Sequence, residues 1–310
     1  LLRVLSAWPI DAVAVEPMGR PTLHRVAASS GDRYVLKNSG PEDETGTLAT
    51  QYFATQHAHR SGVPVAYLLT TAGGGYSTRQ GGDVYTLMPY LANEPTDLLA
   101  ADAAPIYENL GDAIGRLHRA FSSYGRPIAA SPRRLEEMLH NGAVDALPER
   151  LEGNGRRVVE RTIALLDEPV GEYSPRMPVQ PILWDCHEGN VLLNGGRVSG
   201  FVDCDRIVRG PPICDLASFL GSIVLSDRPD AQVRRWLDFT PHLIRGYHRN
   251  VSLSAEERHA LPHAIRLVML GFLHLFLLRR AEQRVAPLLR RLEWLNNCAD
   301  DLHAAMQTAD

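Results

Sequence analysis

The sequence predicts an α+β protein of two lobes, a small β-rich lobe followed by a larger, mainly helical one. Short alternating segments are concentrated before residue 90, stretches with helical periodicity dominate after it, and Leu91–Pro95 between them has the character of a linker. We therefore divide the chain into residues 1–90 and residues 91–310. A chain of 310 residues is long enough for two lobes that share a cleft.

The N-terminal lobe is predicted to be a sheet with one helix. Two alternating segments, residues 23–27 and 33–37, are joined by the turn-rich Ser29–Asp32, which predicts a β-hairpin. The remainder of the lobe is predicted as one helix and two strands, over residues 47–60, 63–71 and 83–88 respectively.

The C-terminal lobe is predicted to be helical around one further hairpin. Residues 106–122 are strongly periodic, with Leu110, Ile114 and Leu117 on one face. Further helical stretches are expected over residues 135–139, 156–166, 215–225, 232–249 and 255–306. The Asn-Gly pair at residues 194–195 lies between two short apolar segments, a strong signal for a hairpin.

Composition limits the classes of partner. The net charge of −4 provides no general attraction for nucleic acid. The longest apolar run, Leu267–Leu278, is shorter than the roughly 20 residues that span a bilayer, so we expect a buried helix and no membrane partner. The 4 cysteines match no common zinc spacing and no signal-peptide pattern opens the sequence as given. We expect reduced thiols, a cytoplasmic location, and a monomer or homodimer.

Three side chains around the second hairpin suggest chemistry. Asp185 and Asn190 lie five positions apart before the hairpin, and Asp203 follows it. Phosphoryl transfer requires a carboxylate near the attacking hydroxyl and oxygen ligands for a metal ion that neutralises the transferred group. An Asp and an Asn at this spacing, followed by a hairpin and a second Asp, form the catalytic pattern of protein kinases.

The surrounding residues make the pattern more specific. The stretch Trp184–Asn190 resembles the H-G-D-x-H-x-x-N-V-L motif of the aminoglycoside phosphotransferase, choline kinase and homoserine kinase type II family. Val202–Asp205 is similar to its I-D-[WF]-[DE] segment, and Arg209–Ala217 to its G-D-P-x-x-D-L-A segment. The resemblance implies a protein-kinase-like bilobal fold and a kinase of small-molecule hydroxyl substrates that uses ATP and Mg2+. It makes Asp185 the catalytic base, Asn190 and Asp203 the metal ligands, and Asp215 a brace of the loop.

The resemblance extends upstream, from about residue 15. It implies that Lys37 contacts the nucleotide phosphates and that Met88 and Tyr90 belong to the hinge that binds adenine. Gly19 stands in the phosphate loop, where relatives are often richer in glycine.

Departures from the family pattern bear on the same residues. Leu183 and Trp184 replace the usual His-Gly, and Gln51 stands near the position expected for the acidic partner of Lys37. For Trp184 core packing is favoured over substrate stacking, and for His187 loop packing over catalysis. Asp205 is balanced between assisting near the metal and being solvated or paired with an arginine.

The leading hypothesis is an ATP-dependent phosphotransferase. The alternative is a catalytically weak or inactive nucleotide-binding pseudokinase with a regulatory role, which the departures motivate. A protein kinase fits poorly, because no A-P-E-like segment follows Asp215. The acceptor stays open among amino-alcohols, sugars and aminoglycoside-like antibiotics, as does the choice between ATP and GTP.

Overall fold

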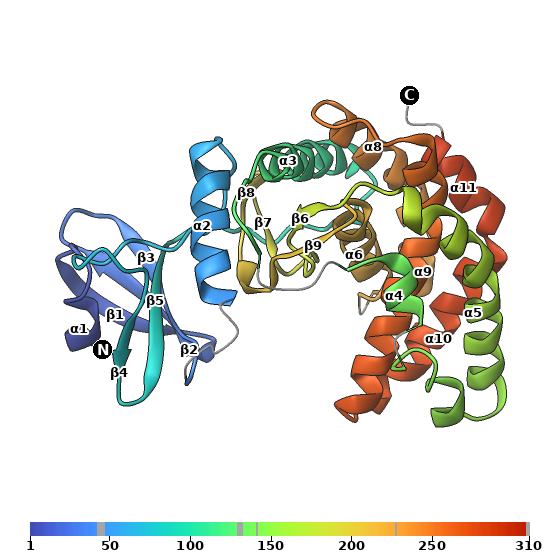
Figure 1. The fold of residues 1–310 in the computed structure, drawn as a ribbon, viewed down its shortest axis with the longest axis horizontal. Coiled ribbons are helices and arrows are strands. Elements are labelled where there is room, and N and C mark those ends of the chain that lie inside the picture. The colour runs from blue at the N-terminus through green and yellow to red at the C-terminus, as the bar shows by residue number, and fades with distance from the viewer. Residues whose placement is uncertain (42–46, 129–132, 141, 227, 308–310) are drawn as a thin grey trace.

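The computed structural model describes residues 1–41, 47–128, 133–140, 142–226 and 228–307. Figure 1 shows a twisted sheet at the N-terminal end, a helix standing beside it, and a larger helical part that contains the C-terminus. The predicted α+β architecture, with a β-rich N-terminal part and a helical C-terminal part, is confirmed. The exact division at residues 90 and 91 stays a prediction.

The N-terminal sheet is five-stranded and antiparallel, in the order β1-β2-β3-β5-β4. Its strands are β1 (Ala12–Met18), β2 (Arg20–Ala28), β3 (Arg33–Asn38), β4 (Thr78–Gln80) and β5 (Asp83–Pro89), and a short helix, α1 (Leu2–Leu5), precedes them. The predicted hairpin is the β2–β3 pair, in which Val26 faces Tyr34 across the strands. Val26 and Leu36 are fully buried in a small core of this sheet.

The prediction of a strand over residues 63–71 is wrong. This segment forms only an isolated bridge, between Val65 and Phe201. Its backbone groups bond to different partners, because the Ala66 N–H donates to Phe201 while the Leu69 N–H donates to Leu87 in β5. Pro64 has no N–H to contribute to a ladder. The segment therefore ties the sheet to the helical lobe instead of extending the sheet.

Helix α2 (Thr47–Arg60) lies between the two parts in Figure 1. Its Ala54 and Ala58 are fully buried in the large core of the helical part. The next long helix, α3 (Ala104–Ser122), packs closely against α8 (Trp236–His248). A Cβ added at Gly111 would lie 1.9 Å from the carbonyl oxygen of Leu243, so glycine is what allows this approach.

The remaining helices complete the helical part. They are α4 (Leu135–Leu139), α5 (Gly153–Tyr173), α6 (Ile213–Val224), α7 (Asp230–Val233), α9 (Ala255–Leu278), α10 (Glu282–Asn297) and α11 (Ala299–Gln307). The helical stretch predicted over residues 255–306 divides into α9, α10 and α11, and Arg280 adopts a left-handed φ of 53° at the first break. One straight helix of that length would extend about 78 Å, and the breaks let α10 pack back on α9. The stretch predicted over residues 232–249 divides likewise into α7 and α8.

Two short antiparallel pairs lie within the helical lobe. They are β6 (Gln180–Ile182) with β9 (Val208–Gly210), and β7 (Val191–Asn194) with β8 (Arg197–Phe201). Single 3-10 turns occupy Pro148–Arg150, Ser174–Arg176 and Cys204–Arg206. The second pair is the hairpin predicted from Asn194-Gly195. In sequence this hairpin lies between the loop of residues 183–190 and Asp203. Its length therefore sets the distance between the side chains of the loop and Asp203.

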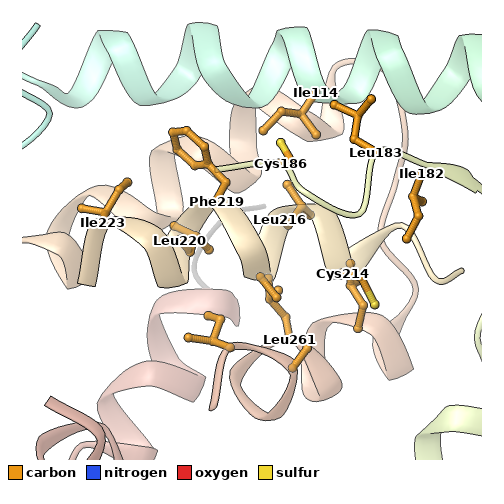
Figure 2. Packing of buried hydrophobic residues seen from close by; sticks show 14 of the residues in the cluster. Ile114, Ile182, Leu183, Cys186, Cys214, Leu216, Phe219, Leu220, Ile223 and Leu261 are labelled. Atoms are coloured by element: carbon orange, nitrogen blue, oxygen red, sulfur yellow. The ribbon is translucent and has the colours of Figure 1, made fainter. Parts of the chain in front are cut away.

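Helix α6 forms the floor beneath the 183–190 loop. Figure 2 shows its Leu216 and Phe219 facing Cys186 of the loop and Ile114 of α3. All four side chains are fully buried. Burial raises the pKa of the Cys186 thiol well above its ordinary value, so this cysteine packs as a neutral apolar group.

Helix α9 is the one helix in the described ranges that is long and apolar enough to cross a membrane. Within its most apolar window 56% of the residues are buried inside the fold, and Leu270 and Leu273 are fully buried. This burial is typical of the core helix of a soluble protein, which passes the same test of length and composition.

Candidate active site

A cavity of about 290 Å3, here called the cleft cavity, lies between the N-terminal sheet and the helical lobe. Its apolar walls come from both parts of the chain and include Val35, Ala66, Met88, Leu192 and Val202. Polar side chains also line it, among them Lys37 of the sheet and Asn190 and Asp203 of the helical lobe. Residues distant in sequence thus converge on one hollow.

Lys37 connects the lobes electrostatically. Its Nζ lies 2.5 Å from Asp203 Oδ1 and 3.0 Å from Asp205 Oδ2. Burial lowers the pKa of Lys37, but its hydrogen bonds and ion pairs with the two carboxylates outweigh this, so the net pKa is raised and the ammonium stays charged. Gln51 also lines the cleft cavity. The described acidic partners of Lys37 are therefore in the helical lobe, at a position that the sequence did not reveal.

Backbone hydrogen bonds and backbone conformation fix the positions of Asn190 and Asp203. The Asn190 Nδ2 donates to the Asp185 carbonyl at 3.0 Å, and the Val202 N–H donates to the Asn190 carbonyl at 2.9 Å. Asp203 has a left-handed φ of 55°, which costs free energy in a residue other than glycine and is typical of functional sites. These bonds fasten the loop to the strand that precedes Asp203.

Asp185 lines a different cavity, also of about 290 Å3, here called the Asp185 cavity. Trp184, Arg206 and Phe272 contribute to its walls. Asn190 lines the cleft cavity, five residues along the same loop. The 183–190 loop therefore contributes to both hollows, with Asp185 in one and Asn190 in the other.

His187 packs within this loop. Its Nδ1 accepts a hydrogen bond from the Gly189 N–H at 3.0 Å, while its Nε2 lies 3.8 Å from Asp185 Oδ1. The first contact is a hydrogen bond, and the second is too long to be one. The geometry agrees with the loop-packing interpretation.

A buried carboxylate holds the start of the loop. Asp215 is fully buried and accepts hydrogen bonds from the backbone N–H groups of Leu183 and Trp184, both at 2.8 Å. His118 Nε2 lies 3.1 Å from Asp215 Oδ2, and His118 Nδ1 lies 2.8 Å from the Tyr247 hydroxyl. Because a carboxylate only accepts, His118 donates to Asp215 through Nε2, while its Nδ1 forms the hydrogen bond with the tyrosine hydroxyl.

The brace supports an unusual backbone. Trp184 has a left-handed φ of 67°, which reverses the chain directly before Asp185. Sequence reasoning identified Asp215 as the brace but missed His118 and Tyr247. His118 is a polar residue on the otherwise apolar face of α3, and this was the available signal.

The predicted nucleotide contacts occupy separate parts of the cleft. Met88 and Tyr90 line the cleft cavity, and the Tyr90 N–H donates to the Arg33 carbonyl at 2.9 Å. The guanidinium of Arg33 lies 4.8 Å from the centre of the Tyr90 ring. Gly19, with a φ of +57°, forms the turn between β1 and β2, and its neighbour Arg20 lines the cavity while Gly19 does not.

Part of the chain is similar in sequence to curated proteins. Curated homoserine kinases from strains of Pseudomonas aeruginosa are 31% identical over 160 residues, which is 51% of this chain and 48% of the relatives. The matched region thus spans about half the length of these relatives.

Solved structures resemble nearly the whole chain. A microcompartment-associated aminopropanol kinase has a TM-score of 0.72 at 14% identity, covering 96% of this chain and 97% of its own. An amicoumacin kinase in complex with AMP-PNP and Ca2+ has a TM-score of 0.70 at 14% identity, covering 94% and 91%. A choline/ethanolamine kinase family protein from Mesorhizobium loti has a TM-score of 0.61 at 18% identity, covering 95% and 92%. At these identities the likeness shows the fold.

The model of the phosphotransferase enzyme family matches residues 20–249, from the second strand of the sheet through α8. This range contains Lys37, the 183–190 loop, Asp203 and Asp215, and so the brace and nearly all of the cleft cavity fall within it, whereas the α9 wall of the Asp185 cavity lies outside it. The chain belongs to the phosphotransferase enzyme family.

Proposed function

We propose that this chain is a cytoplasmic, magnesium-dependent kinase that transfers the γ-phosphoryl group of ATP to a hydroxyl group of a small molecule. The observation that carries the proposal is that the 183–190 loop lines two cavities, one with Asn190 and the other with Asp185. One offers apolar walls and a lysine, and the other offers a carboxylate. Relatives named as homoserine kinases, and structural neighbours crystallised with AMP-PNP or ADP, support the reaction class.

The cleft cavity suits a nucleotide. Val35, Ala66 and Leu192 would pack on the adenine ring, whose faces are apolar. Because the Tyr90 N–H is already bonded to Arg33, we assign recognition of the base edge to the Tyr90 carbonyl and the backbone of Leu91, which also lines the cavity.

Positive charge for the phosphates comes from two side chains. Lys37 and Arg20 both line the cavity, and Arg20 supplies charge beside the single glycine of the β1–β2 turn. A side-chain cation can thus take over part of the anion binding that a glycine-rich loop performs through backbone amides.

The oxygen atoms present fit magnesium. Among the described residues no group of three His, Cys, Asp or Glu side chains is arranged to hold a metal ion. Mg2+ is, however, usually bound by one or two protein oxygens together with substrate phosphates. Asn190 Oδ1 and an Asp203 carboxylate that already attracts the Lys37 ammonium are suitable ligands. Magnesium bound there would neutralise charge on the phosphate oxygens.

Asp185 is assigned the role of general base. Its carboxylate is partly exposed to the Asp185 cavity, with a side-chain relative exposure of 29%. An acceptor hydroxyl bound there would donate its proton to Asp185 while its oxygen forms the new bond to the γ-phosphorus and ADP leaves. The Asp215 brace keeps the carboxylate in place during this exchange.

The test is ADP release across a panel of hydroxyl compounds, with Asp185→Asn beside the wild type. Losing a general base lowers kcat by about 10²–10⁴-fold. Nucleotide affinity, measured by calorimetric titration, should be unchanged in Asp185→Asn and weakened in Lys37→Met. An exposed carboxylate, Asp167, provides the matched control variant Asp167→Asn.

The turnover measurement and the affinity measurement each have an outcome that contradicts the role assigned to the residue. Wild-type turnover in Asp185→Asn would remove this residue from the chemistry. Unchanged nucleotide affinity in Lys37→Met would remove the cleft cavity as the nucleotide site.

A further inference from the structure

The Asp185 cavity has predominantly apolar walls. Helix α9 contributes Leu267, Val268, Phe272 and Leu275, and Trp184 also lines the cavity. Trp184 is only partly buried against the core, so part of its ring faces the hollow. A strongly hydrated acceptor would lose water here without compensating hydrogen bonds, whereas an apolar ring or chain would be stabilised.

The charged side chains of the cavity are one carboxylate and one guanidinium. Asp185 is the single acidic residue among its described lining residues, and Arg206 is the single arginine. A polycationic acceptor would require several carboxylates, because each ammonium group needs a partner when water is displaced. The composition of the walls therefore disfavours such a compound.

Arg206 is available to a ligand. It is exposed in the 3-10 turn that follows Asp203, and it makes no hydrogen bond or ion pair with any residue in the described ranges. Arg228, by contrast, is engaged with Glu188 at 3.3 Å. An unpaired guanidinium at the rim of an apolar hollow is a suitable partner for a planar anion such as a carboxylate.

Further polar groups line the same hollow. Ser218 is a buried residue of α6 that lines it. His274 Nδ1 is likewise buried without a described partner. The guanidinium of Arg133 lies 5.9 Å from the centre of the Trp184 ring and adds positive charge to this side of the loop.

We propose, on the basis of the function proposed above, that the acceptor is a hydroxy acid with an apolar, ring-sized body, whose carboxylate binds Arg206 while its hydroxyl reaches Asp185. The apolar walls hold the body of the acceptor between these two charges. Arg206 is a specificity determinant in this assignment and takes no part in the bond-making step.

The test compares acceptors of one shape and three charges. They are 4-(hydroxymethyl)benzoate, 4-(hydroxymethyl)benzamide and 4-(aminomethyl)benzyl alcohol, with homoserine added as a carboxylate that lacks the apolar body. In the wild type kcat/KM for the benzoate should exceed that for the amide about tenfold or more, the effect of one charge-assisted hydrogen bond. The amine and homoserine should be poorer still.

Variants then assign the preference to its residue. Arg206→Ala should abolish the advantage of the benzoate over the amide, and Arg206→Glu should make the amine the best of the three. Arg209→Ala is the matched control, because Arg209 is an exposed arginine nearby in sequence that does not line the cavity. Gly271→Leu should raise KM for every acceptor without changing ATP affinity, since a Cβ at Gly271 points into open space.

Failure of this inference differs from failure of the proposed function. If the wild type phosphorylates the amine or homoserine as well as the benzoate, or if Arg206→Glu keeps the wild-type order, the acceptor assignment is overturned while the kinase stands. Lack of turnover of the benzoate also overturns it. Absence of ADP release with every hydroxyl compound overturns both. Calorimetric titration of the benzoate into Asp185→Asn and into Arg206→Glu gives a readout without turnover, and equal affinity in the two contradicts the role of Arg206.

Discussion

Replacing Asp215 by Asn tests the brace beneath the 183–190 loop. The change keeps the shape but turns one carboxylate oxygen into an NH2 group, while the Leu183, Trp184 and His118 donors stay in place. One donor is then left facing another donor in a fully buried site, which costs about 1–3 kcal/mol. The remaining bonds lose their charge assistance, at about 1 kcal/mol each. We expect the free energy of unfolding to fall by about 3–5 kcal/mol.

The assay is urea unfolding followed by tryptophan fluorescence, together with kcat on any accepted substrate. Asp167→Asn, a change at an exposed carboxylate, should leave the midpoint unchanged. Tyr247→Phe removes only the distal hydroxyl and should cost about 1 kcal/mol. The order of the three midpoints follows from the distance of each group from the loop. A wild-type midpoint for Asp215→Asn would refute the brace, and a wild-type kcat would show that loop position does not depend on it.

Two further predictions concern packing and pH. Gly111→Ala should destabilise the fold by about 1–3 kcal/mol or more in thermal unfolding, because its Cβ would collide with the Leu243 carbonyl, whereas Gly171→Ala in the open face of α5 should be neutral or stabilising. Burial lowers the pKa of His263 from 6.5 to about 3, so the unfolded chain binds a proton below pH 6.5 that the folded chain refuses until about pH 3. Stability contributed by the neutral imidazole is thus lost as the pH falls through this window. Between pH 7 and pH 5 the wild type should lose about 2 kcal/mol more than His263→Gln in urea unfolding, and equal losses would contradict the shift.

The elements that the sequence predicted well are those whose determinants are local. The β2–β3 hairpin and the hairpin after Asn190 combine short alternating segments with turn residues, and the structure forms both. Residues 63–71 failed for the opposite reason. Their apolar character is real, but their partners are Phe201 and Leu87, and no pattern within the segment specifies that the backbone bonds to two separate strands.

The same distinction applies to the candidate site. The sequence predicted that Asp185, Asn190 and Asp203 would converge beneath the strand that carries Lys37. Asn190 and Asp203 line one cavity with Lys37, whereas Asp185 lines the other. The partners of Lys37 could not be predicted, because its contact with Asp205 joins residues 168 positions apart through the packing of two lobes. Gln51 gave a clue, since a glutamine at the position expected for the acidic partner cannot supply the negative charge that a buried ammonium needs.

The pairing of Lys37 also bears on how the site is used. Two carboxylates face one ammonium, so the cluster of Lys37, Asp203 and Asp205 carries a net negative charge when all three are ionised. On the proposed function, this surplus attracts the metal ion that accompanies the nucleotide, and the incoming phosphates provide new partners for the ammonium. The metal ion would therefore take over the carboxylates while Lys37 turns to the phosphates, and the two cations would not compete for one anion. The reason is that the metal ion and the phosphates bring positive and negative charge into the cleft together. A glutamate in place of Gln51 would hold the lysine independently of the metal. Its absence leaves Asp203 and Asp205 as the described carboxylates that set the position of Lys37 before the nucleotide binds.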